Sequence, residues 1–81
     1  MKLRILSAER VLFEGETQSV KVPGSKGAFE ILEGHAPIIS TLQAGKLSYI
    51  GETEEELDIA GGFIDVHENE VEVGVELAIE K

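Results

Sequence analysis

The side chains that could take part in acid–base or metal chemistry are those of two histidines and sixteen acidic residues. His35 lies in a Gly-His-Ala-Pro run, where a contact role and a purely structural role, with the ring bonded to loop backbone, are both open. His67 precedes a turn, so we expect it to be exposed. Asp65 and Glu30 could form a carboxylate pair, but acids this abundant on strands are mostly solvated. We therefore expect no catalytic residue.

Nucleophilic, metal and phosphate chemistry lack their usual residues. There is no cysteine, and no serine sits in a Gly-x-Ser-x-Gly elbow. Two histidines cannot make a zinc site alone, and the acidic run Glu54–Glu56 lacks the spacing of a calcium loop. We expect that run to be a solvated hairpin tip. No glycine-rich phosphate loop is present, so we expect no enzyme activity, no cofactor and no metal.

The charge balance excludes two classes of partner. Sixteen acidic residues against seven basic ones give a net charge of −9. Nucleic-acid binding needs clustered Lys and Arg, and adsorption on anionic lipid needs the same. No signal peptide and no apolar run of about 18 residues occurs, so we expect neither secretion nor insertion into lipid. An acidic surface kept for solubility and a partner with a basic surface both remain as explanations of the charge.

Strands must position these residues, because the apolar side chains recur with a period of two. Turn signals interrupt the pattern at short intervals, and no apolar set with helical spacing lasts two turns. The sequence therefore predicts an all-β fold, a single-domain antiparallel β-sandwich of about ten short strands over residues 1–81. The inward positions are Leu3 and Ile5, Val20 and Val22, Leu57 and Ile59, Ile64 and Val66, and Val71, Val73 and Val75, with Ser19 and Lys21 outward.

Four places have a predicted backbone role. Pro23 ends strand pairing, because it has no N–H for a ladder. Ala60–Gly62 is expected to form a bulge or a close backbone approach. Glu68-Asn69 is expected to be a hairpin turn with Asn69 at positive φ. Residues 76–81 are either a last strand or a frayed tail.

The run Gly27–Leu42, Gly-Ala-Phe-Glu-Ile-Leu-Glu-Gly-His-Ala-Pro-Ile-Ile-Ser-Thr-Leu, closely resembles the epsilon subunit of F-type ATP synthases. In that family a Gly-x-hydrophobic-x-Ile-Leu/Tyr-x-Gly/Asn-His-Ala-Pro pattern leads into an apolar strand and a glycine. Residues 6–15 look like the family's first hairpin, residues 20–24 lead into the signature, and residues 61–66 look like its Gly-Gly-hydrophobic-x-Glu/Asp-Val segment. The resemblance covers essentially the whole chain.

The resemblance implies a ten-stranded β-sandwich at the foot of the central stalk, without an active site. Such a subunit binds the gamma subunit on one side and rests on the polar loops of the membrane c-ring. It is a rotor part that couples proton flow to ATP synthesis. The implied location is the cytoplasmic face of the bacterial inner membrane, as a peripheral part of the complex.

The resemblance also implies contact residues. The family's c-ring contacts match Gly27, Ala28, Phe29, Glu30 and His35. At Ala28 some relatives carry an acid, and Glu30 or Glu33 could supply that charge from nearby. The motif does not place the gamma contacts. The candidates are apolar positions in Ile38–Leu42 and near Gly61–Phe63, for which core packing is the favoured role, namely Ile38, Ile39, Leu42, Gly62 and Phe63.

The family usually continues beyond a segment matched by Leu77–Glu80 into a two-helix hairpin, so the resemblance is to the sandwich alone. A chain ending at Lys81 would lack the hairpin's inhibition of ATP hydrolysis and its ATP site. Two other classes stay open. One is a lipoyl or biotinyl carrier domain, with Lys46 or Lys26 as the modified lysine, and the other is a generic binding module.

Overall fold

A computed structural model describes residues 1–78 of the chain, and eight strands form its fold. Within that range there is no helix, so none is long and apolar enough to cross a membrane. The all-β prediction is confirmed. The strands are β1 (Lys2–Leu6), β2 (Val11–Glu16), β3 (Ser19–Val22), β4 (Phe29–Leu32), β5 (Ile38–Leu42), β6 (Gly45–Ile50), β7 (Glu54–His67) and β8 (Glu70–Leu77).

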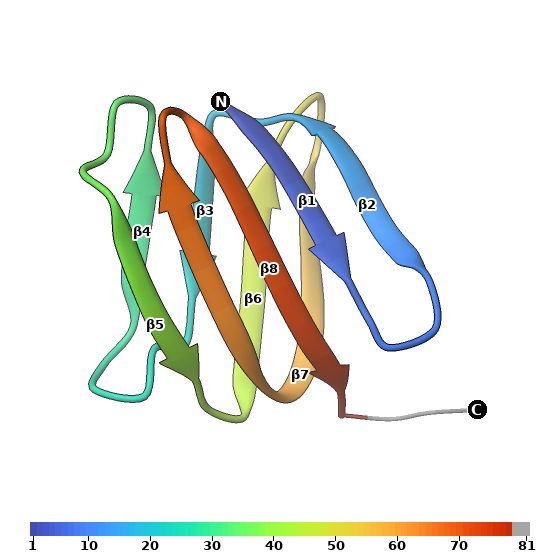
Figure 1. The fold of residues 1–81 in the computed structure, drawn as a ribbon. Helices are drawn as coiled ribbons and strands as arrows, with labels where there is room; N and C mark the ends of the chain where they lie inside the picture. Colours follow the sequence, from blue (N-terminus) through green and yellow to red (C-terminus); the bar gives the residue numbers. More distant parts are fainter. Residues whose placement is uncertain (79–81) are drawn as a thin grey trace.

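The strands make two layers, and β7 belongs to both (Figure 1). The first part of β7 pairs with β6 in the back layer, beside β3 and β4. Its second part pairs with β5 and β8 in the front layer, which β1 and β2 complete. The register shifts between Ile59 and Gly61, and Gly62 has a φ of 156°. The bulge predicted at Ala60–Gly62 is therefore the corner at which the chain changes layers.

The sandwich differs from the predicted one in two respects. It has eight strands rather than about ten, because β7 continues through its bulge for 14 residues. It is also not wholly antiparallel, because β1 pairs with β8 in parallel, from Lys2 opposite Glu70 to Leu6 opposite Gly74. A parallel pair joins strands that are distant in sequence, and local alternation cannot reveal it.

The predicted inward residues fill the space between the layers. Leu3, Ile5, Val20, Ile59 and Ile64 are among the largest fully buried side chains, so the period-two prediction is confirmed. Ser19 was expected outward, and this was wrong. Its short side chain is buried between its cross-strand partners, Leu32 on β4 and Ile50 on β6, whereas the longer Lys21 on the same strand is exposed.

Of two turns predicted from local sequence, one is present where it was predicted and the other is displaced. Glu68 and Asn69 both have positive φ, 49° and 62°, as in the tight hairpin that such a pair favours. The prediction for Asn69 is confirmed. Glu54–Glu56 was predicted as a hairpin tip, and this was wrong, because these acids form the start of β7 and the tip precedes them. Strand β8 ends at Leu77, and the part of the predicted strand or tail at 79–81 lies outside the described residues.

Candidate subunit interface

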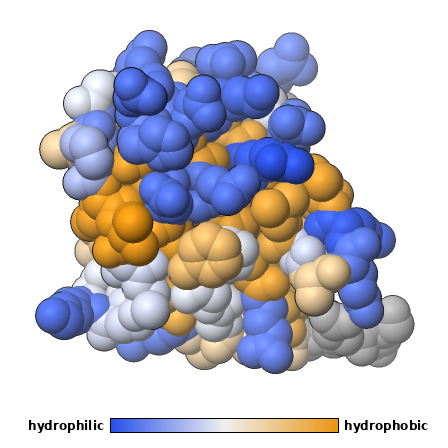
Figure 2. All heavy atoms as spheres, viewed as in Figure 1, coloured by the Kyte–Doolittle hydropathy of each residue, from blue (hydrophilic) through white to orange (hydrophobic). Residues whose placement is uncertain are grey.

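The outer surface of the front layer is divided between charge and apolar side chains. Figure 2 shows hydrophilic residues over its upper half and hydrophobic ones in a band below. In the charged half Arg4 lies between two glutamates, with Nε 3.8 Å from Glu14 and Nη1 3.4 Å from Glu72. His67 Nδ1 lies 3.4 Å from the Asp65 carboxylate. These side chains are exposed, and Arg4 is paired with both glutamates, so this half is a solvated charge ladder.

The apolar half is organised by Phe63 and Gly74. The two residues are direct partners across β7 and β8, and a Cβ on Gly74 would overlap the Phe63 ring. The ring therefore lies flat on the strand because residue 74 has no side chain, and it stays 46 % exposed. Beside it a cleft of about 430 Å³ is lined by Leu6, Ser7, Ala8, Gly61, Gly62, Phe63, Gly74, Val75 and Glu76.

Ile39 extends this surface onto β5. It is 78 % exposed, the largest value among the exposed large hydrophobic side chains of residues 1–78. It lies opposite Asp65 on β7, two residues from the position opposite Phe63. Ile39 lines a separate cleft, of about 580 Å³, together with the turn between β3 and β4. Exposed apolar side chains on adjacent strands, each beside a cleft and bordered by charge, are typical of a protein interface.

The five candidate gamma contacts are therefore not equivalent. Ile39 and Phe63 present side chains to solvent. Ile38 is half-buried, and Gly62 contributes only backbone at the corner. Leu42 is 5 % exposed and packs in the core, which is the competing role that the sequence allowed for it.

The five residues assigned to the c-ring fall in two separate places (Figure 1). Gly27 and Ala28 form the turn between β3 and β4, and Phe29 and Glu30 begin β4. His35 lies in the loop after β4, at the opposite end of that strand. The structure does not bring His35 together with the other four.

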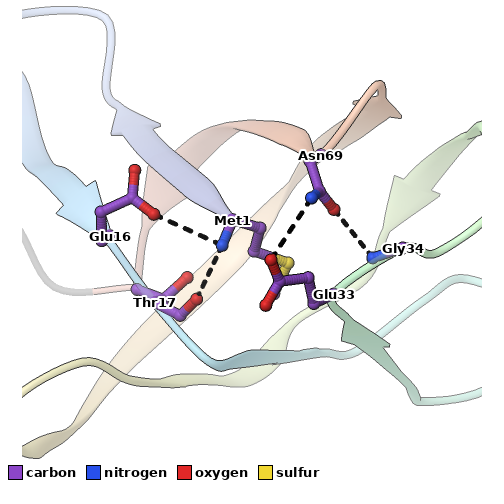
Figure 3. Close-up of polar contacts among 6 residues, drawn as sticks. All are labelled: Met1, Glu16, Thr17, Glu33, Gly34 and Asn69. Carbon is purple, nitrogen blue, oxygen red and sulfur yellow. Dashed lines mark hydrogen bonds and ion pairs between the residues drawn. The ribbon is translucent and has the colours of Figure 1, made fainter.

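The loop that carries His35 is held by hydrogen bonds (Figure 3). The Gly34 N–H donates to Asn69 Oδ1 at 2.7 Å, and Asn69 Nδ2 donates to Glu33 Oε2 at 3.5 Å. The half-buried His35 ring lies with Nδ1 2.6 Å from the Ala36 carbonyl oxygen, and the backbone N–H of His35 donates to Leu32 O at 3.0 Å. The backbone-bonding role considered for His35 is thus present. Sequence reasoning found the Asn69 turn but not this link, because nothing local signals a bond across 35 residues.

The amino-terminal group forms a second unanticipated anchor (Figure 3). The Met1 NH₃⁺ donates to Thr17 O at 3.2 Å and lies 3.4 Å from Glu16 Oε1. The Met1 side chain is buried against the core. Thr17 Oγ1 is buried without a hydrogen-bond partner among residues 1–78. The start of β1 is thereby fixed to the connection between β2 and β3.

The geometry offers little to the catalytic and carrier alternatives. Asp65 lies in the front layer and Glu30 in the back layer, so they do not form the pair considered for acid–base work. Lys46 lies inside β6, where its Nζ donates to Asp58 at 2.9 Å, and this bond raises the pKa of Lys46. Lys26 does lie in a hairpin turn. In the described part of the chain, no three His, Asp or Glu side chains gather as metal ligands do.

Comparison with known proteins identifies the family. Residues 1–81 match the family described as "ATP synthase, Delta/Epsilon chain, beta-sandwich domain". The ATP synthase epsilon chain of Caulobacter vibrioides is 40% identical over 77 residues, covering 94% of this chain and 90% of that one. That of Chlorobaculum tepidum is 42% identical over 69 residues, covering 83% and 78%. That of Leptospira interrogans (serovar copenhageni) is 39% identical, and the chain spans only 58% of its length.

Solved structures show the same fold. The chain superposes on part of the Tetrahymena thermophila mitochondrial ATP synthase central stalk and c-ring with a TM-score of 0.82 at 14% identity, covering 93% of this chain and 62% of that one. For a chain of the Euglena gracilis mitochondrial ATP synthase (OSCP/F1/c-ring) the TM-score is 0.84 at 21% identity, covering 90% and 48%. From its sequence match over all 81 residues, the chain belongs to the family of the ATP synthase delta/epsilon-chain β-sandwich domain.

Proposed function

We propose that the chain is a non-catalytic central-stalk subunit of an F-type ATP synthase, which links gamma to the c-ring. The observation that carries this is the apolar half of the front layer, where Phe63 and Ile39 are exposed, each beside its own cleft. The relatives are ATP synthase epsilon chains. The subunit would then lie at the cytoplasmic face of a bacterial inner membrane, as a peripheral part of the complex.

Gamma would cover the apolar half of the front layer. An exposed Phe beside a shallow cleft has the form of an interface anchor, because burying an aromatic ring in a fitted site contributes much of the binding energy. The charge ladder around Arg4 would lie at the edge of the contact, where it stays hydrated. Phe63 and Ile39 are exposed and so are available for this contact, whereas Leu42 is buried in the core.

The c-ring would be met by the turn at Gly27 and Ala28 with the start of β4. Residues 25–28 of this turn are exposed. Polar loops of a membrane ring present backbone and short polar side chains, which a small, exposed turn can approach closely. His35, at the other end of β4, would be a second and separate contact.

The fold suits the transmission of torque. Strand β7 runs through both layers, so the layers are joined by a continuous backbone as well as by the core. A close-packed interior resists deformation. Torque applied to one side of the domain is therefore transmitted to the other side with little deformation of the fold.

Binding of the purified chain to the gamma subunit tests the proposal. Phe63→Glu and Ile39→Glu should each weaken binding by about tenfold or more, because each would bury a charge in an apolar contact. Leu32→Glu is the matched control, since Leu32 is 52 % exposed on β4 of the back layer. Gamma binding that is equally strong in all three variants, or absent from the unaltered chain, would overturn the proposal.

A further inference from the structure

A second cleft, of about 470 Å³, lies between β2 and the hairpin of β6 and β7. It shares no lining residue with the cleft beside Phe63. Phe13 and Tyr49 line it, with ring centroids 4.5 Å apart and ring planes at 43°. Both side chains pack against the core on one side and are only half-buried. The cleft therefore has an aromatic floor that remains open to a ligand.

The rim of this cleft is acidic. Its lining contains Glu14, Glu16, Glu52 and Glu55 and no basic side chain. Glu14 lies near Lys2 and Arg4, and Glu16 near the terminal amino group. Within residues 1–78, Glu52 and Glu55 form no ion pair. The field in the cleft is therefore negative, and the fold leaves part of it uncompensated.

Tyr49 and Glu55 give the cleft a specific geometry. They are direct partners across β6 and β7, so their side chains lie side by side on one face. The Glu55 carboxylate is held by the Thr53 hydroxyl, which donates to Oε2 at 2.7 Å. Burial, and then the charge of Glu55, raise the pKa of Tyr49. At neutral pH the ring is thus a neutral phenol beside a fixed carboxylate.

We propose that this cleft binds an arginine side chain from a basic segment of a partner protein. A guanidinium can stack on an aromatic ring and bond a carboxylate with two N–H groups at once, and this cleft holds both groups side by side. A lysine ammonium matches less well, because it is a hydrated point charge without a planar fork. The charge of the rim and the net charge of −9 select a cation rather than an apolar or acidic segment.

The experiment is an NMR titration of the whole 81-residue chain with three capped peptides. The probes are acetyl-Gly-Arg-Arg-Gly-amide and its Lys-Lys and Gln-Gln counterparts. We expect the arginine probe to shift the ring signals of Phe13 and Tyr49, to bind about threefold or more tighter than the lysine probe, and to weaken with salt. The glutamine probe should leave the rings unshifted. Equal shifts with the arginine and glutamine probes would overturn the proposal.

Paired variants locate the binding. Glu52→Gln with Glu55→Gln should weaken the arginine probe by about tenfold, because it removes the two unpaired carboxylates. Glu54→Gln with Glu56→Gln is the matched control, since it removes the same charge from exposed neighbours that do not line the cleft. Equal losses in both pairs would mean a general charge effect and would overturn the proposal. So would sedimentation showing that the chain alone forms a dimer that Glu52→Gln with Glu55→Gln abolishes, because the occupant would then be a second copy.

The proposal is independent of the gamma contact. The Glu52/Glu55 variant should still bind gamma as the unaltered chain does, since its changes lie outside the Phe63 surface. Loss of gamma binding by the unaltered chain, with the arginine probe still bound, would sink the stalk proposal alone. Gamma binding without arginine binding would sink this inference alone.

Discussion

Asn69 and Gly34 are joined by a hydrogen bond of 2.7 Å from the Gly34 N–H to the Asn69 side-chain oxygen. The bond connects the turn between β7 and β8 in the front layer to the loop after β4, which belongs to the back layer. Asn69 also has a φ of 62°, and its carbonyl oxygen accepts from the Lys2 N–H. One residue thus fixes a turn, the start of β1 and the loop that carries His35.

Asn69→Gly should separate these roles. Glycine keeps the positive φ but removes the side-chain bond, so we expect a loss of about 1 kcal/mol in the free energy of unfolding. The Gly34 amide should exchange its hydrogen faster than in the unaltered chain. Asn69→Ala should lose about 1 kcal/mol more, because alanine is strained at this φ. Urea unfolding and hydrogen exchange measure both effects, and unchanged exchange at Gly34 in Asn69→Gly would contradict the role of the bond.

Two glycines of the front layer should respond differently to alanine. A Cβ on Gly62 would overlap the backbone oxygen of Gly74, and the φ of 156° is unfavourable for alanine, so Gly62→Ala should lose about 3 kcal/mol. The three atoms nearest to a Cβ on Gly74 all belong to the Phe63 ring, which can swing into solvent. Gly74→Ala should therefore lose less than about 1 kcal/mol while displacing the ring. Thermal melts and the NMR signals of the Phe63 ring test this. Equal losses of stability in the two variants would contradict the prediction, because they would mean that the backbone moves to relieve the contact of the residue 62 Cβ with the Gly74 oxygen.

Ile64 and Ile39 form a matched pair for separating stability from binding. Ile64 is fully buried, so Ile64→Ala should lose about 2–5 kcal/mol, out of the 4–12 kcal/mol expected for a domain of about this length. Ile39→Ala should change the unfolding free energy by less than about 0.5 kcal/mol, because the side chain is already in water. It should still weaken gamma binding. A large loss of stability in Ile39→Ala would mean that the Ile39 side chain packs against other residues in the folded state, which would contradict its exposure.

Stability should fall as the solution becomes strongly alkaline. The pKa of Tyr49 is raised above its ordinary 10.0, mainly by burial, and that of Lys46 above 10.5, mainly by its bond to Asp58. The folded state therefore keeps both protons at a pH where the unfolded state has lost them. The stabilisation is complete below the ordinary pKa values and is lost as the pH rises through the folded ones.

The chain has one tyrosine and no tryptophan, so the ultraviolet absorbance of tyrosinate follows Tyr49 alone. Glu55→Gln should lower this pKa but leave it above its ordinary value, since burial remains. Melting curves between neutral and alkaline pH should be less steeply pH-dependent in Tyr49→Phe. A titration of Tyr49 at its ordinary pKa would contradict the environment described for its ring.

The two candidate c-ring contacts can be told apart, because they lie at opposite ends of β4. Ala28→Lys changes the exposed turn, and His35→Ala changes the other loop; both should keep the fold, since neither residue is in the core. In reconstituted ATP synthase we expect Ala28→Lys to lower proton-driven ATP synthesis, with ATP hydrolysis by the soluble complex unchanged. A loss of ATP synthesis in His35→Ala but not in Ala28→Lys would assign the c-ring contact to the loop after β4 instead.

The sequence predicted the features that depend on neighbouring residues. Alternation identified Leu3, Ile5 and Ile64 as core, and glycine and asparagine chemistry located the corner at Gly61 and the turn at Asn69. Features that depend on distant residues were missed. The parallel pairing of β1 with β8, the Asn69–Gly34 bond and the Phe13–Tyr49 contact all join segments whose approach is set by the whole fold. The acidic run Glu54–Glu56 was evident from the sequence, but the contact of Phe13 with Tyr49 beside Glu55 was not.

The parallel pairing of β1 and β8 also governs when the chain can fold. Arg4 and Glu72, which face each other across that pair, are 68 residues apart. During translation β1 therefore leaves the ribosome long before its central neighbour exists, and until then only β2 covers one of its edges. Non-local closure of this kind is slow and leaves a strand edge open to other chains. Nascent chains that stop before β8 should engage chaperones, and release should come only once the chain has emerged as far as Gly74, the last residue that pairs with β1.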